Sequence, residues 1–157
     1  MIDKIIFLDI DGVLNCISTK ARCQGCIGID DLKVKILKEI ISKTNAKIVL
    51  TSTWKIDWDK NLEDCSYAGK YLNNKLKKQG LWILDKTKDN TNDRGQGIYN
   101  WIKKYNIKNW AVFDDEIFDD YDNMIINHLV KTKFYDDNGG LQEEHIEKAI
   151  NILNGDE

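Results

Sequence analysis

The chain has 157 residues and a formal net charge of −3, a length typical of one domain with a sizeable hydrophobic core. Its 42% hydrophobic residues and five tryptophans exclude a disordered chain, and its negative charge excludes a globally basic nucleic-acid-binding protein. No stretch approaches the ~20 apolar residues of a membrane helix. Because a predicted strand begins at once, we expect no signal peptide, no membrane partner and a cytoplasmic location.

Charge is unevenly distributed along the chain. Residues 70–88 contain six lysines and one aspartate, whereas residues 114–122 contain six acids and no base. This segregation favours an acidic metal centre beside a basic surface that attracts anions, although ordinary solvated loops would have the same composition.

The first predicted element is a strand at residues 5–8, an uninterrupted apolar run typical of burial on both faces. Asp9 and Asp11 follow it with a spacing of two, so their side chains lie on the same side of the chain. Gly12 then lets the backbone turn sharply. Neighbouring carboxylates are costly to desolvate without a cation or a proton, which favours a site over a simple capped turn.

The next elements form a predicted strand–helix–strand unit. A loop at residues 16–28 precedes a helix that starts at Asp30 or Asp31 and runs to about Lys43, with apolar residues at helical spacing. A second buried strand at residues 47–50 follows and ends in polar Thr51 and Ser52. A connection of this length predicts that the two strands are parallel.

The pattern is weaker between residues 55 and 88, where we expect a helix ending at Gly80 and a short apolar run at residues 81–84. A clearer helix begins near Gln96. Its predicted buried face carries Ile98, Trp101, Ile102 and Tyr105.

A third buried strand at residues 110–113 stops abruptly at Asp114 and Asp115. We expect a last strand near residues 127–132, which would include His128, and a helix from Leu141 to about residue 153, which would include His145. Neither histidine is a predicted ligand.

Alternating strands and helices predict an α/β fold, a central parallel sheet covered on both faces. Ligands of such sheets bind beyond the carboxyl ends of the strands, at the switch point of the topology. Three predicted strands end in polar clusters, so the fold would assemble one site from three distant segments.

The segment Asp9-Ile10-Asp11-Gly12-Val13-Leu14-Asn15 resembles the first motif of the haloacid dehalogenase (HAD) superfamily, mostly phosphatases and phosphotransferases. The likeness continues in chain order to residue 153 and implies one HAD-like domain, residues 1–157, with a Rossmann-like three-layer sandwich. The spacing of the motifs implies a minimal cap, with a flap loop at residues 13–29 and a small lid at residues 55–90.

By this resemblance, Asp9 is the nucleophile that forms an aspartyl phosphate, and Asp11 is the general acid and base. Thr51 matches the second-motif residue that hydrogen-bonds a phosphoryl oxygen, although Thr51 taken alone is better explained by a strand-end turn. Ser52 and Gly12 would help to bind the substrate.

Asp114 and Asp115 resemble the fourth motif, whose acids hold Mg²⁺ together with Asp9 and the backbone carbonyl of Asp11. For direct ligation of the metal we expect Asp115 first and Asp114 second. Asp119 is a further alternative.

The third motif supplies a cation. Arg94 stands just before a predicted helix, where its guanidinium and free helix N–H groups could both reach an anion. Lys86 and Lys88 are alternatives, because many HAD enzymes use a lysine here, and Lys86 is also a predicted substrate-binding residue.

The resemblance implies a Mg²⁺-dependent phosphomonoesterase. It is closest to the small HAD domains of RNA-repair and phage-type proteins, through Thr51-Ser52-Thr53-Trp54 and Arg94-Gly95. This favours a terminal phosphate of a nucleotide or nucleic acid as the phosphorylated substrate, with a small phosphometabolite or a phosphoprotein as alternatives. The competing functions are a catalytically silent HAD-like binding domain and a receiver-like signalling module.

The remaining candidates lie outside these motifs. Cys23 and Cys26 form a single CxxC pair, so a zinc site would also need Cys16 and Cys65, and free thiols are the simpler expectation. Trp54 is expected to pack in the core, with stacking on a substrate base as the alternative.

Overall fold

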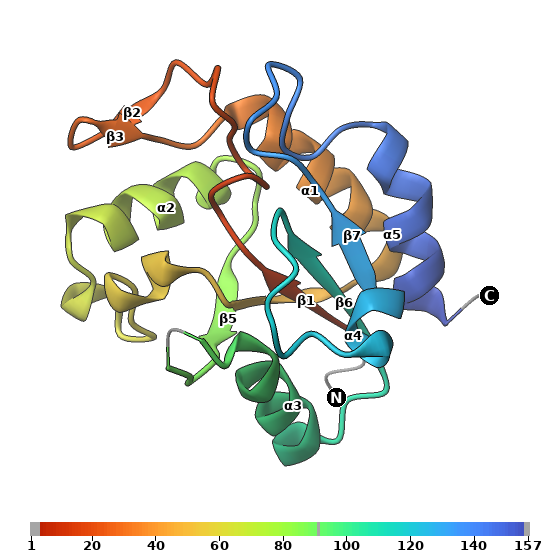
Figure 1. Cartoon of the computed structure of the whole chain (residues 1–157). Helices are drawn as coiled ribbons and strands as arrows, with labels where there is room; N and C mark the ends of the chain where they lie inside the picture. The colour runs from red at the N-terminus through yellow and green to blue at the C-terminus, as the bar shows by residue number, and fades with distance from the viewer. Residues whose placement is uncertain (1–3, 91, 156–157) are drawn as a thin grey trace.

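The computed structural model describes residues 4–90 and 92–155. Its centre is a five-stranded sheet with the order β5-β4-β1-β6-β7, in which all neighbouring strands are parallel (Figure 1). The strands are β1 (Lys4–Leu8), β4 (Lys47–Leu50), β5 (Ile83–Lys86), β6 (Asn109–Asp114) and β7 (Leu129–Lys131). The predicted α/β fold with a central parallel sheet is confirmed.

Helices cover both faces of this sheet (Figure 1). They are α1 (Asp31–Thr44), α2 (Tyr67–Lys77), α3 (Arg94–Tyr105), α4 (Asn123–Asn127) and α5 (Glu144–Asn154). Side chains of α1, α2 and α5 pack into one hydrophobic core, and those of α3 and α4 into another. The molecule is therefore a three-layer sandwich.

β1 serves both cores, because its side chains alternate between the two faces. Ile6 and Leu8 belong to the core under α1 and α5, whereas Ile5 and Phe7 belong to the core under α3. All four are completely buried. The doubly buried strand expected from the apolar run is thus the centre of the sheet.

The strand order places the switch point of the topology beside β1. The chain first adds β4 and β5 on one side of β1 and then returns to add β6 and β7 on the other. The carboxyl ends of β1, β4 and β6 therefore adjoin at the edge where ligands of such sheets bind.

The ends of α1 agree with the sequence pattern. The Asp30 side chain accepts a hydrogen bond from the Leu32 N–H at 3.0 Å, and Asn45 ends the helix with a left-handed φ of 59°. The predicted helix after residue 55 is shorter than expected: α2 ends at Lys77, because Gly80 turns the chain with a φ of 70°.

The C-terminal third contains the larger corrections. Asn123–Asn127 is the short helix α4, capped by the side chain of Asp122, so β7 begins only at Leu129 and His128 lies between the two elements. α5 begins at Glu144 and not at Leu141. Isolated short runs of apolar residues do not distinguish a helical turn from a strand, and here the cap at Asp122 decides for the helix.

Shorter elements border the carboxyl edge of the sheet. A two-residue hairpin joins β2 (Arg22–Cys23) and β3 (Cys26–Ile27), with a turn at Gln24 and Gly25, and η1 (Thr53–Ile56) and η2 (Leu62–Asp64) are 3-10 helices. Within residues 4–90 and 92–155, no helix combines the length and apolarity needed to cross a bilayer.

Candidate active site

The polar ends of three strands meet at the carboxyl edge of the sheet. The N–H of Asp9, just after β1, bonds the Phe113 carbonyl of β6 at 3.0 Å. The N–H of Thr51, just after β4, bonds the Leu8 carbonyl at 2.9 Å. These backbone hydrogen bonds continue the parallel ladders and hold the three segments in register.

An acidic cluster lies at the centre of this edge. Asp9, Asp114 and Asp115 each offer a carboxylate oxygen, and these oxygens lie within 4.8 Å of one another. Asp9 and Asp114 are buried. Burial and the nearby charge of Asp114 raise the pKa of Asp9 well above its ordinary value, and burial raises the pKa of Asp115 to about 6. The cluster therefore carries negative charge that only a cation or bound protons can offset.

Arg94, the first residue of α3, supplies one cation to this cluster. Its Nη1 atom lies 3.0 Å from Asp114 Oδ2 and 3.4 Å from Asp9 Oδ1. Burial lowers the pKa of the guanidinium, but Asp9 and Asp114 outweigh it and raise the pKa overall. The ring of Phe118 lies 4.2 Å from the guanidinium carbon and covers it.

Asp114 is occupied by donors of the protein itself. Besides Arg94, it accepts hydrogen bonds from the Tyr121 hydroxyl at 2.8 Å and from the Glu116 N–H at 3.0 Å. Burial and Asp114 raise the pKa of Tyr121, so this hydroxyl remains a donor. Asp115, the next residue, accepts fewer hydrogen bonds from the protein than Asp114 does. Asp115 is therefore the more available metal ligand.

The Asp11 carboxylate is more exposed and is oriented from two sides. Asn15 Nδ2 donates to its Oδ1 at 2.9 Å, and Trp54 Nε1 donates to its Oδ2 at 3.2 Å. Asn15 is itself held by the Gly12 N–H and the Gly28 carbonyl. Sequence reasoning gave Asn15 no role, yet it positions Asp11. Trp54 packs against the hydrophobic core as expected, and its indole N–H also orients Asp11.

Gly12 permits the close approach of two motif segments. Its φ of 84° is left-handed, and a Cβ at this position would lie 2.4 Å from Asp115 Cγ. Glycine is therefore required here because Asp115 fills the space that a side chain would need.

Thr51 is buried, and its hydroxyl is the one buried side-chain oxygen or nitrogen without a hydrogen-bond partner among the described residues. Such a group is costly unless a ligand or water pairs with it. The neighbouring Ser52 hydroxyl is already used, since it accepts the Trp54 N–H at 3.2 Å and caps η1.

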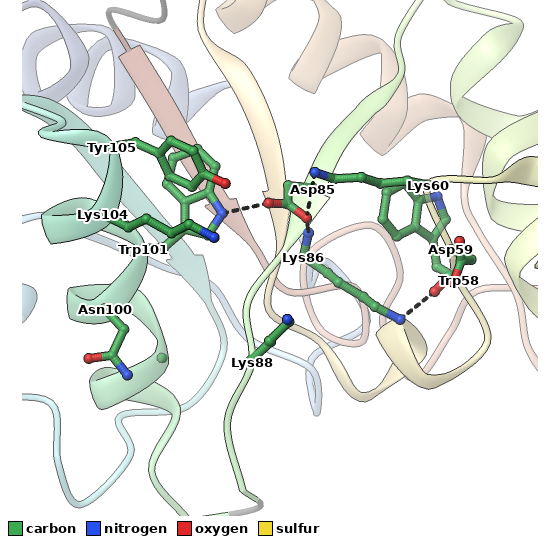
Figure 2. A pocket seen from close by; sticks show the side chains of 11 residues that line it. Trp58, Asp59, Lys60, Asp85, Lys86, Lys88, Asn100, Trp101, Lys104 and Tyr105 are labelled. Atoms are coloured by element: carbon green, nitrogen blue, oxygen red, sulfur yellow. Dashed lines mark hydrogen bonds and ion pairs between the residues drawn. The ribbon is translucent and has the colours of Figure 1, made fainter.

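Two other predicted anion-binding groups lie elsewhere. Lys86 Nζ donates to the carbonyls of Lys55 at 2.8 Å and Trp58 at 2.6 Å, and Figure 2 shows it at a different cavity together with Lys88. The structure thus does not bring Lys86 or Lys88 to the acidic cluster.

The N–H groups at the start of α3 are not free, which corrects the expectation that they could reach an anion. The Asp120 carboxylate accepts the N–H groups of Gly95 at 3.0 Å and Gln96 at 2.9 Å. Asp120 comes from a loop 25 residues later, and no local pattern in the sequence indicates this contact.

The four cysteines are separated. Cys23 and Cys26 face each other across the β2–β3 hairpin, whereas Cys16 lies near Ser18 and Cys65 near Asp59. Among the described residues, no cluster of three or more metal-ligating side chains contains a cysteine. All four are free thiols.

The acidic cluster opens into a cleft of about 820 Å³. Its lining includes Asp11, Arg94 and Asp115 at the edge of the sheet, and Cys23 and Cys26 of the β2–β3 hairpin. Its further lining includes the aromatic side chains of Trp54, Phe118, Phe134 and Tyr135.

The donor set of the cluster fits a hard divalent cation. Carboxylate oxygens are ligands that Mg²⁺ accepts, with water completing the octahedron. Two of the three acids are buried with one guanidinium between them, so a second cation would offset the remaining charge.

Comparison with known proteins gives one match. A family profile described as the HAD domain in Swiss Army Knife RNA repair proteins matches residues 5–146. No curated protein and no solved structure matches the chain.

Proposed function

This chain belongs to the family of HAD domains in Swiss Army Knife RNA repair proteins, and from that membership we propose that it is a Mg²⁺-dependent phosphomonoesterase. The observation that carries this proposal is the acidic cluster, in which Asp9, Asp114 and Asp115 converge with Arg94. When bound, Mg²⁺ would offset the negative charge of these carboxylates and of a phosphoryl group. Asp9 and Asp115, with Asp114 and the backbone carbonyl of Asp11, would hold it.

In the first step, Asp9 attacks the phosphorus atom, and the bond between phosphorus and the leaving oxygen breaks. Asp11 gives a proton to that oxygen. In the second step, Asp11 takes a proton from a water molecule, whose oxygen attacks the phosphorus of the aspartyl phosphate and releases Asp9 with inorganic phosphate. The hydrogen bonds from Asn15 and Trp54 to Asp11 support this role, because they orient the carboxyl group.

Thr51 and Arg94 are suited to the phosphoryl group itself. The unpaired Thr51 hydroxyl would donate to a phosphoryl oxygen, which gives this buried group its missing partner. Arg94 would orient Asp9 through its contact at 3.4 Å and would oppose the rise in the pKa of Asp9 that burial and Asp114 cause. The absence of a side chain at Gly12 would leave room for the metal ligand Asp115. Ser52 would act indirectly, because its side chain caps η1.

We further propose a terminal phosphate of a nucleotide or nucleic acid as the substrate. The cleft is large, and its aromatic lining consists of Tyr135, which is 86% exposed, and three half-buried rings, Trp54, Phe118 and Phe134. Aromatic rings are typical platforms for unstacked bases. A small phosphometabolite or a phosphoprotein remains the alternative that the assay below distinguishes.

The test is phosphate release from p-nitrophenyl phosphate and from 3′- and 5′-phosphorylated oligonucleotides, with Mg²⁺ and with a chelator. We expect metal-dependent release by the parent protein and its loss in Asp9→Asn. Asp119→Asn, a change at an exposed acid of the same acidic segment outside the cluster, serves as the matched control and should retain activity.

Each rival function gives a different result. A catalytically silent binding domain would release no phosphate from any substrate, and release that survives Asp9→Asn would exclude Asp9 as the nucleophile. A receiver-like module would keep a stable phosphoryl group without turnover. The position of Asp9 and Asp11 after β1 already disfavours a receiver, whose phosphorylated aspartate follows a later strand.

A further inference from the structure

A second cavity, of about 450 Å³, lies beside the edge strand β5 (Figure 2). We call it the lysine cavity, because Lys60, Lys86, Lys88 and Lys104 line it together with Trp101 and Tyr105. None of these side chains has a role in the proposed phosphatase reaction.

Two of the four lysines are committed to the protein. Lys86 Nζ donates to two backbone carbonyls, as described above, and Lys60 lies 3.5 Å from the Asp85 carboxylate. Asp85 also accepts the Trp101 Nε1–H at 2.9 Å, so its charge is already engaged. Asp85 therefore does not neutralise the other lysines, and the second acid of the lining, Asp59, forms no ion pair with a described residue.

The ammonium groups of Lys88 and Lys104 are left without a carboxylate. Both side chains are exposed, and neither forms an ion pair or a hydrogen bond within the described part of the chain. Figure 2 shows both side chains at this cavity. Two unpaired cations at one cavity favour an anionic ligand.

The cavity also offers an aromatic surface. The Tyr105 ring lies 4.3 Å from the Trp101 ring, centroid to centroid, and remains 39% exposed. Lys104 Nζ lies 5.3 Å from the centre of the same ring. This exposure corrects the prediction that Tyr105 belongs to the buried face of its helix. A ring supported by Trp101, with an ammonium group that has no carboxylate partner next to it, is suited to a ligand that has both a base and a phosphate.

Two segments of the chain contribute residues to both the lysine cavity and the active-site cleft. α3 places Arg94 in the cleft and Gly97 and Trp101 in the cavity, which is ~4.5 Å and ~10 Å further along the helix axis. The segment after β4 likewise lines the cleft with Trp54 and the cavity with Trp58. A polymer whose end lies at Asp9 would thus have its next residues within reach of Lys88 and Lys104.

We propose that the lysine cavity binds the nucleotides next to the terminal phosphate of a single-stranded nucleic acid. Lys88 and Lys104 contact backbone phosphates, and a base stacks on Tyr105. This inference rests on the proposed function for the place of the terminal phosphate. A phosphometabolite bound at Asp9 would not extend to this cavity.

The experiment measures binding by fluorescence anisotropy of a labelled single-stranded oligonucleotide, between about 50 mM and about 200 mM salt. Asp9→Asn is the background, so that hydrolysis does not affect the signal. The test variant adds Lys88→Ala and Lys104→Ala. The matched control adds Lys35→Ala and Lys148→Ala, which remove the same charge from exposed positions of α1 and α5 on the opposite face of the sheet. Circular dichroism verifies that each variant is folded.

We expect the test variant to bind at least about tenfold more weakly at low salt, and its slope of log affinity against log salt to fall by ~1.4, since each phosphate contact on a single strand contributes ~0.7. The control variant should keep the affinity and the slope of its background. Tyr105→Leu should weaken binding by about tenfold, whereas Tyr105→Phe should not, because the ring and not the hydroxyl stacks.

Equal losses in the test and control variants, or no loss in either, would overturn the inference, because the lysine cavity would then not be a specific contact. The failure of the proposed function is seen separately, as an absence of phosphate release by the parent protein from p-nitrophenyl phosphate and from the phosphorylated oligonucleotides. Binding that depends on Lys88 and Lys104 without such release would support the cavity and reject the phosphatase.

Discussion

The buried Thr51 hydroxyl is expected to serve ligand binding and not the stability of the fold. An unsatisfied buried polar group costs about 1–3 kcal/mol. We therefore expect Thr51→Val to unfold at the same or a higher denaturant concentration than the parent protein, while kcat/KM for a phosphoester falls by about tenfold to a hundredfold. Chemical denaturation and steady-state kinetics on the same samples check both parts.

The control for Thr51 is Thr44, another buried threonine. Its hydroxyl donates to the Ile40 carbonyl at 2.8 Å and accepts the Ala46 N–H. Thr44→Val should lower the free energy of unfolding by about 1 kcal/mol and leave the kinetics unchanged. If Thr51→Val were as destabilising as Thr44→Val, Thr51 would have a structural partner.

Gly12 and Gly25 allow the backbone and the packing contributions of a glycine to be separated. Both have a left-handed φ, of 84° and 81°, but a Cβ at Gly12 would collide with Asp115, whereas none of the described atoms lies within 4 Å of one at Gly25. We expect Gly25→Ala to cost about 1 kcal/mol. Gly12→Ala should cost clearly more and also weaken the dependence of activity on Mg²⁺, as measured by denaturation and metal titration.

Among the secondary-structure elements, the start of α3 positions Arg94, the cation of the site. Asp120 caps this end of the helix through the N–H groups of Gly95 and Gln96. Asp120→Ala should lower the free energy of unfolding by about 1 kcal/mol and reduce kcat through displacement of Arg94. Asp119→Ala, at the preceding exposed position, should stay within about 0.5 kcal/mol of the parent protein. A kcat unchanged by Asp120→Ala would mean that Arg94 is held by its own carboxylates alone.

The elements that the sequence predicts best are those with an unambiguous apolar pattern that ends in polar residues. The strands β1, β4 and β6 are uninterrupted apolar runs with clear polar ends, and α1 has apolar residues at helical spacing, so the arrangement of the sheet follows from them. Short elements such as α4 and η2 offer too few residues for a period to be recognised. The same holds for β2 and β3.

The residues of the candidate site also divide into those that the sequence predicts and those that it does not. Asp9, Thr51, Asp114 and Arg94 are recognisable, because strand ends and a motif order mark them in the sequence. The partners that orient these groups, Tyr121 and Asp120, lie in an irregular segment whose side chains meet the site only through tertiary packing. No spacing rule applies to such contacts.

For the whole molecule, the buried acids link stability to pH. Burial raises the pKa of Asp115 to about 6, so between pH ~4 and ~6 the folded metal-free protein binds more protons than the unfolded chain. The free energy of unfolding that Asp115 contributes therefore falls as pH rises through this window. Burial shifts the pKa of Asp9 in the same direction.

We accordingly expect Asp115→Asn, in chelator, to be more stable than the parent protein at pH 7, and the difference to shrink towards pH 4. Addition of Mg²⁺ at pH 7 should stabilise the parent protein, by ~2.7 kcal/mol at a hundred times the dissociation constant, and the Asn variant much less. Urea denaturation at several pH values measures both effects. A parent protein more stable than the variant in chelator would contradict the pKa assignment.

The parallel pairing of β1 with β6 also determines when the site can form while the chain is being synthesised. Leu8 pairs with Phe113 across more than a hundred residues, and Thr132 donates to the carbonyl of Gly12. Such distant pairings form late, since closing a long loop costs entropy before the contacts repay it. A nascent chain on the ribosome that has emerged only as far as β5 therefore has the first motif but not the acids that complete the cluster. The site becomes complete only after the second half of the sheet has been translated and has docked.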